Sequence, residues 1–158
     1  MFEVTTELET IYLYPAAIAV PNKQTLVHTI LGSCVAVCLF DTKLKIGGIN
    51  HYMLPFWNGQ GLASPKYGNI AIEKLFQKLT YNGARQENLI VKLFGGGEVL
   101  ESVNQHFNVG QRNIMLAYEM LDQLKLRIVA ESTGGKYGRK IIFNTGTGEV
   151  TQKYVKSS

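Results

Sequence analysis

The segment from Cys34 to Phe40, Cys-Val-Ala-Val-Cys-Leu-Phe, constrains the fold of this chain more than any other part of the sequence. An unbroken apolar run of this length is typical of a strand that is buried on both faces. Residues 41–44 have the composition of a turn, and residues 46–54 are predicted to return as a second strand. In that strand, Gly47 and Gly48 allow a bulge or a close approach of another segment. We therefore expect a central hairpin inside a sheet.

Two stripes of apolar side chains at helical spacing predict two helices, the first in the middle of the chain and the second nearer its C-terminus. The first stripe consists of Ile72, Leu75, Phe76 and Leu79, and the second of Ile114, Ala117, Tyr118 and Leu121. Asn82-Gly83 is predicted to cap the first helix, and a short third helix is expected over residues 98–107. Further strands are expected over residues 11–20, 26–30, 88–94, 127–132, 139–144 and 150–155. Because strands and helices do not alternate strictly, we expect an α+β fold with mixed sheets and helices packed outside them.

The length of 158 residues fits a single domain that spans residues 1–158. Hydrophobic residues make up 46% of the chain and charged residues 18%, which is typical of a globular protein. No apolar run approaches the roughly 20 residues that cross a membrane, and the N-terminus lacks the pattern of a signal peptide. We therefore expect a cytoplasmic protein that is not inserted in a membrane, with Cys34 and Cys38 as free thiols.

Neither the charge pattern nor the motifs predict a nucleic acid, a metal ion or an organic cofactor. The net charge of +4 is spread along the chain, without the aromatic and basic pattern of an RNA-binding sheet. No CxxC pair and no HExxH motif is present, and the glycine runs 95–97 and 134–135 lack the spacing of a dinucleotide fingerprint. We interpret these glycine runs as turns or as places where a substrate backbone comes close.

The predicted hairpin brings a cysteine and a histidine to facing positions. If the hairpin is centred between Thr42 and Lys43, Asp41 opposes Leu44 and Cys34 opposes His51. Directly opposed residues on one face have Cβ atoms about 4.5–5.5 Å apart, so a thiol and an imidazole could meet. A shift of the register by one residue would place them on opposite faces of the sheet.

A thiol beside an imidazole is the arrangement that cysteine-dependent catalysis needs. The imidazole of His51 can accept the proton of Cys34 and give an ion pair that is reactive at neutral pH. Gly32 and Ser33 allow a tight loop whose backbone N–H groups, with that of Cys34, could face a developing oxyanion. The competing interpretation is an inert cysteine in an apolar strand, and we prefer that interpretation for Cys38.

Several motifs occur in a fixed order along the chain, namely residues 31–39 (LGSCVAVCL), 47–55 (GGINHYMLP), 66–69 (KYGN), 92–97 (KLFGGG), 110–113 (GQRN), 130–135 (AESTGG) and 138–140 (GRK). Together these motifs resemble those of one known family, the chemoreceptor glutamine deamidases (CheD). The resemblance covers about residues 10 to 155. It implies an enzyme that converts glutamines on the cytoplasmic helices of methyl-accepting chemoreceptors into glutamates, with Cys34 as nucleophile and His51 as base.

The resemblance also implies a fold, a partner and a third member of the site. The fold would be a mixed β-sandwich flanked by helices, as in bacterial toxin deamidases, and the partner a chemotaxis phosphatase similar to CheC. The family has a threonine upstream of the cysteine that orients the histidine. In this chain the matching position falls on His28 or, one residue later, on Thr29. We predict Thr29, because a hydroxyl can accept a hydrogen bond from an imidazole N–H, and keep His28 as the alternative.

Two other functions compete with the enzyme. The chain could be a binding module that regulates the phosphatase without much catalysis, or a thiol redox protein that uses Cys34 and Cys38. The substrate of the enzyme would be a side chain on a folded helix, so the site is expected to be shallow. Tyr52, Phe56 and Trp57 follow the histidine and are expected either to line this groove or to pack in the ordinary way.

Overall fold

The computed structural model describes residues 8–99 and 108–156, and this part of the chain forms two β-sheets and two α-helices. The strands are β1 (Glu9–Tyr12), β2 (Ile18–Ala19), β3 (Thr25–Leu31), β4 (Val35–Asp41), β5 (Ile46–Asn50), β6 (Leu89–Gly95), β7 (Arg127–Thr133), β8 (Gly138–Asn144) and β9 (Val150–Val155). The helices are α1 (Gly68–Tyr81), α2 (Val109–Gln123) and the short 3-10 helix η1 (Gln86–Asn88).

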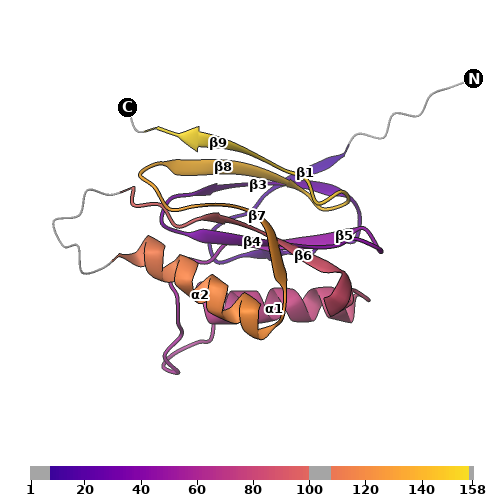
Figure 1. Cartoon of the computed structure of the whole chain (residues 1–158), viewed down its shortest axis with the longest axis horizontal. Helices are drawn as coiled ribbons and strands as arrows, with labels where there is room; N and C mark the ends of the chain where they lie inside the picture. Colours follow the sequence, from indigo (N-terminus) through magenta and orange to yellow (C-terminus); the bar gives the residue numbers. More distant parts are fainter. Residues whose placement is uncertain (1–7, 100–107, 157–158) are drawn as a thin grey trace, which may run out of the picture.

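The elements are arranged in three layers. One sheet has the strand order β1-β3-β8-β9 and the other β2-β5-β4-β6-β7, and each combines parallel and antiparallel pairs. Figure 1 shows the four-stranded sheet at the top, the five-stranded sheet below it and both α-helices beneath the five-stranded sheet. The expected α+β fold with mixed sheets is therefore confirmed. The helices cover one outer face of the sandwich only.

Two apolar cores hold these layers together, and β4 contributes to both. One core lies between the five-stranded sheet and the helices and includes Val35, Val37 and Leu39. The other lies between the two sheets and includes Ala36 and Cys38. All seven residues of β4 are buried, because each face of the strand is covered, as the apolar run predicts.

Both helices that the apolar stripes predict are present. α1 ends with Asn82 as its C-cap residue, and Gly83 follows with φ of +104°, a left-handed conformation that glycine adopts without strain. Glu98 and Val99 are not helical, and the rest of the predicted third helix, residues 100–107, lies outside the described residues. No helix in residues 8–99 and 108–156 combines the length and the apolar character that crossing a membrane requires.

The strand predicted over residues 11–20 is wrong as a single element, because the chain changes sheets there. β1 lies in the four-stranded sheet and β2 in the five-stranded sheet. Between them Ala16 has φ of +68°, and its N–H donates to the carbonyl of His51 at 2.8 Å. The crossing from one layer to the other therefore interrupts the strand and brings this connection against the histidine.

The hairpin of β4 and β5 is present, but its predicted register is wrong by two residues. Asp41 pairs with Ile46, and the carboxylate of Asp41 accepts the N–H groups of Lys43 and Leu44 at 2.9 and 2.8 Å. Lys45 closes the loop with φ of +57°. This carboxylate stabilises a longer loop than the predicted one. Because the shift is even, every residue keeps the face of the sheet that the prediction gave it.

The second strand of the hairpin ends earlier than predicted, at Asn50. The side-chain oxygen of Asn50 accepts the N–H of Val37 at 2.8 Å, where a continuous ladder would use a main-chain carbonyl. Pairing between the two segments resumes at the single bridge of Val35 and Tyr52. The glycines of the strand serve close packing, since a Cβ on Gly48 would lie 2.8 Å from Leu75 of α1.

Candidate active site

Cys34 and His51 lie at the ends of neighbouring strands, on the face of the five-stranded sheet that is turned towards the other sheet. Cys34 directly precedes β4 and is partly exposed, whereas His51 directly follows β5 and is 1% exposed. Val35 and Tyr52 form two backbone hydrogen bonds of 3.1 and 2.9 Å, which places Cys34 opposite Met53. His51 is therefore a diagonal neighbour of Cys34 instead of its direct partner. The Cα atoms of diagonal neighbours are about 7–8 Å apart.

Thr29 reaches His51 from β3, across the space between the two sheets. Its hydroxyl donates to the carbonyl of Leu13 at 2.7 Å, and its oxygen lies 2.7 Å from Nδ1 of His51. A hydroxyl has one hydrogen to donate, so Thr29 accepts the second bond and Nδ1 carries a proton. The imidazole is thereby fixed in the tautomer whose Nε2 has a free lone pair.

That Nε2 atom is buried and has no hydrogen-bond partner among the described residues. Unpaired buried polar atoms are rare and costly in folded proteins. The ring is also fixed through its main chain, since His51 N donates to the carbonyl of Ala17 at 3.2 Å and Ala16 N donates to the carbonyl of His51 at 2.8 Å. The arrangement leaves a rigid, unoccupied proton acceptor on the face that Cys34 shares.

Burial determines the charge state of both groups. It lowers the pKa of His51 to about 4, because an imidazolium would lose its hydration. Burial also raises the pKa of the Cys34 thiol, although the backbone N–H of the same residue opposes this effect. Both shifts favour a neutral imidazole and a protonated thiol over the ion pair expected from the sequence.

A segment of three glycines holds the cysteine loop. The N–H of Gly96 donates to the carbonyl of Cys34 at 2.8 Å, and the N–H of Gly97 donates to the carbonyl of Gly32 at 2.9 Å. Gly95 has φ of +109°, and a Cβ there would lie 2.2 Å from the carbonyl oxygen of Cys34. These glycines thus permit close contact with the loop that carries Cys34. The oxyanion role predicted for the N–H groups of Gly32 and Ser33 stays a prediction.

The structure separates the two candidates for the third member of the site. His28 and Thr29 are adjacent on β3, so their side chains leave opposite faces of the four-stranded sheet. Thr29 is fully buried between the sheets, whereas His28 is partly exposed and pairs with Tyr12 and Ile142. The hydrogen bond to His51 belongs to Thr29.

The aromatic residues after the histidine have different surroundings. Tyr52 is completely buried, and its hydroxyl donates to the carbonyl of Asn113 in α2 at 2.6 Å. Tyr52 therefore packs in the core beside the helices, which is the second of the two alternatives expected for it. Phe56 is 56% exposed, and Trp57 donates its backbone N–H to the side chain of Asn69. That these two residues line a substrate groove stays a prediction.

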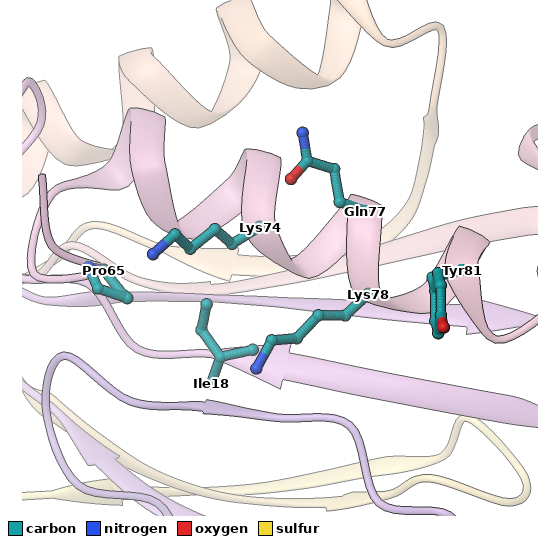
Figure 2. A pocket seen from close by; sticks show the side chains of 6 residues that line it. All are labelled: Ile18, Pro65, Lys74, Gln77, Lys78 and Tyr81. Carbon is teal, nitrogen blue, oxygen red and sulfur yellow. The ribbon is translucent and has the colours of Figure 1, made fainter.

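A separate pocket of about 510 Å³ lies between α1 and the edge strand β2. Figure 2 shows its lining side chains, which are Ile18, Pro65, Lys74, Gln77, Lys78 and Tyr81. Neither Cys34 nor His51 lines this pocket. Within residues 8–99 and 108–156, no group of three histidine, cysteine or acidic side chains could hold a metal ion.

Comparisons with known proteins identify relatives of the chain. A family model described as CheD chemotactic sensory transduction matches residues 53–154. A protein of Trichlorobacter lovleyi named "Probable chemoreceptor glutamine deamidase CheD" is 48% identical over 139 residues, which cover 88% of this chain and 86% of the relative. A protein of the same name from Sulfurimonas denitrificans is 43% identical over 153 residues, covering 96% of this chain and 98% of the relative.

The family model begins after His51, so the geometry of Cys34, Thr29 and His51 described above is independent of that match. The relatives extend the similarity to nearly the whole chain. Since the model covers well over half of the sequence and these relatives exceed 40% identity, the chain belongs to the CheD family.

Proposed function

We propose that this protein is a chemoreceptor glutamine deamidase, which hydrolyses glutamine side chains of methyl-accepting chemotaxis proteins to glutamate and ammonia with Cys34 as nucleophile. The observation that carries the proposal is the hydrogen bond of 2.7 Å between Thr29 and Nδ1 of His51, which leaves Nε2 free as a base. This base lies on the same face as a partly exposed cysteine, in a chain whose relatives bear the name of a glutamine deamidase.

In the first half of the reaction, Nε2 of His51 takes the proton of the Cys34 thiol while the sulfur attacks the carboxamide carbon of the glutamine. The carboxamide oxygen becomes an oxyanion, and the N–H groups of Gly32, Ser33 and Cys34 are the donors that we expect to stabilise it. His51 then gives its proton to the leaving nitrogen. Ammonia departs, and a thioester joins Cys34 to the substrate.

In the second half of the reaction, water is the nucleophile, and His51 again transfers the proton. Nε2 of His51 removes a proton from water as the water oxygen attacks the thioester carbon. The proton then returns to the sulfur as the carbon–sulfur bond breaks, which releases glutamate and restores the neutral thiol. The low pKa of His51 suits this cycle, because the imidazole is neutral at the start of each half and is charged only while it transfers a proton.

The remaining features of the proposal follow from the family. The reaction needs no metal ion and no organic cofactor, and it takes place in the cytoplasm on the helices of the receptors. A phosphatase similar to CheC is a predicted partner. The likeness of the fold to bacterial toxin deamidases also stays a prediction, which a comparison of the two folds would check.

The direct test is mass spectrometry of receptor cytoplasmic fragments after incubation with the purified protein. We expect the mass change of glutamine deamidation with the wild type and none with Cys34→Ala or His51→Asn. Cys38→Ala is the matched control, because it removes the buried cysteine of β4, the strand that Cys34 directly precedes. Deamidation that persists in Cys34→Ala would refute the mechanism. A wild type that binds a CheC-like phosphatase but leaves receptor masses unchanged would favour the binding module.

A further inference from the structure

Asn113 connects the two segments that carry Cys34 and His51. It lies in the first half of α2 and is fully buried. Its side-chain Nδ2 donates to the carbonyl of Ser33 at 3.0 Å and to the carbonyl of Met53 at 3.0 Å. Ser33 directly precedes Cys34, and Met53 follows His51 by two residues. One amide group of a helix therefore bridges the nucleophile loop and the segment of the base.

The chemistry of this bridge requires the amide of asparagine. Both partners are main-chain carbonyl groups, which can only accept, so the side chain must present its two N–H groups to them. A carboxylate of the same shape would have no hydrogen to donate. The oxygen Oδ1 is buried without a partner among the described residues, which costs stability. An apolar residue of similar size would avoid this cost but could not hold the two carbonyl groups.

The position of Asn113 itself is fixed by its surroundings. The hydroxyl of Tyr52 donates to the main-chain carbonyl of Asn113 at 2.6 Å. The start of α2 also approaches the glycine segment closely, since a Cβ on Gly110 would lie 2.5 Å from the carbonyl oxygen of Gly96. The bridge is thus a part of a rigid contact between α2 and the cysteine loop.

The register of the hairpin explains why such a bridge is needed. Cys34 lies beyond the last backbone pair, Val35 and Tyr52, and its diagonal relation to His51 leaves their separation to be set by the flanking segments. Reacting groups must come within about 3–3.5 Å, and a displacement of about 1 Å can cost roughly 100-fold in rate. Asn113 donates one hydrogen bond to each of these flanking segments.

We infer that Asn113 is a positioning residue, which holds the thiol of Cys34 within reach of Nε2 of His51 by bridging the carbonyls of Ser33 and Met53. The inference rests on the proposed function, because it assigns the residue a role in the same reaction. It also explains why the motif Gly110-Gln111-Arg112-Asn113 ends in asparagine, which the packing of α2 alone does not require.

The test compares three substitutions of Asn113 under conditions where each variant is folded, as judged by circular dichroism and thermal melting. Asn113→Asp keeps the shape and removes both donors, Asn113→Ala removes the side chain, and Asn113→Ser retains one donor. We expect kcat for receptor fragments to fall by roughly 100-fold in the first two variants and less in the third, with KM unchanged. Asn144→Ala is the matched control, because Asn144 also binds two backbone N–H groups, those of Gly146 and Thr147, at a distant turn.

A second readout does not depend on the receptor. The rate at which iodoacetamide alkylates Cys34 reports how well His51 removes the thiol proton. We expect this rate in Asn113→Asp and Asn113→Ala to fall to that of His51→Asn, and in Asn144→Ala to equal the wild type. Wild-type kcat and wild-type alkylation in all folded variants of Asn113, with lowered melting temperature alone, would overturn the inference. A wild type that deamidates no receptor would refute the proposed function, while the alkylation rates would still test the bridge.

Discussion

Acidification is expected to destabilise the native protein through the imidazole of His51. Burial lowers the pKa of this group to about 4 in the native state, whereas an exposed histidine has a pKa of about 6.5. Between these two values the unfolded chain binds a proton that the native protein does not bind. The free energy of unfolding therefore falls as the pH drops below about 6.5, and it levels off below about 4. More than about one pH unit above 6.5, both states carry a neutral imidazole, and His51 makes no contribution to the pH dependence.

The magnitude follows from the difference between the two pKa values. Each pH unit of separation corresponds to about 1.4 kcal/mol, and most of the separation is realised at pH 4.5. We expect His51 to lower the free energy of unfolding by about 2–3 kcal/mol between pH 7.5 and pH 4.5. This is a large fraction of the stability of a typical domain, which is about 5–15 kcal/mol.

The assay is urea unfolding of the wild type and of His51→Asn at a series of pH values. Asparagine can still donate a hydrogen bond to Thr29 but does not titrate, so the difference between the two proteins isolates the imidazole. Other acid-sensitive groups cancel in this difference, among them Asp41, whose pKa backbone hydrogen bonds lower. If the difference in unfolding free energy between the two proteins changes by less than about 1 kcal/mol over this range, the imidazole is not held neutral by burial.

Three further predictions concern the surroundings of the pair. Thr29→Val is expected to lower activity by roughly 100-fold and stability by about 1–3 kcal/mol, because His51 loses the acceptor that fixes its tautomer. Gly95→Ala is expected to lower the free energy of unfolding by at least about 1–3 kcal/mol and to reduce activity, because φ of +109° strains alanine and its Cβ would meet the carbonyl of Cys34. Cys38→Ala is expected to cost about 1 kcal/mol and to leave activity intact, since the thiol only fills the core between the sheets. Activity assays and urea unfolding measure all three.

Each of these predictions has a control. Thr29→Ser keeps the hydroxyl and is expected to retain most activity, and His28→Ala is expected to match the wild type. Loss of activity in His28→Ala with activity retained in Thr29→Val would reverse the choice between these two residues. Gly134→Ala also introduces alanine at a positive φ, +79°, but meets no atom within 4 Å, so it separates backbone strain from displacement of Cys34. Inactivity of Cys38→Ala would revive the redox hypothesis.

Local sequence patterns were sufficient to predict α1, α2 and β4. The apolar stripes of α1 and α2 place one face of each helix against the sheet, and the unbroken run of β4 indicates a strand that is covered on both sides. The sequence alone also placed Cys34 and His51 on one face, because alternation along a strand survives an error of two residues in the register.

The length of the turn after β4 and the change of sheet over residues 11–20 were not predicted. The carboxylate of Asp41 stabilises a loop that is two residues longer than predicted. His51 is therefore a diagonal neighbour of Cys34, whereas the predicted register made it the direct partner. The break in the strand over residues 11–20 depends on which sheet each half joins. Neither the length of the turn nor the crossing between sheets leaves a clear signal in local composition.

Cys34 and His51 were identifiable from the sequence as a pair, and the family resemblance predicted Thr29 as their third member, whereas the role of Asn113 was not predicted. The hydrogen bond of Thr29 exists because β3 in one sheet faces β5 in the other, and the bridge of Asn113 exists because α2 packs against the cysteine loop. The sequence by itself therefore determined the candidate pair, since the chemistry of a thiol and an imidazole is a property of the residue types and their shared face is a property of strand alternation. The tertiary structure alone decided the tautomer, the charge state and the spacing of these groups, because each depends on burial and on atoms that are far away along the chain.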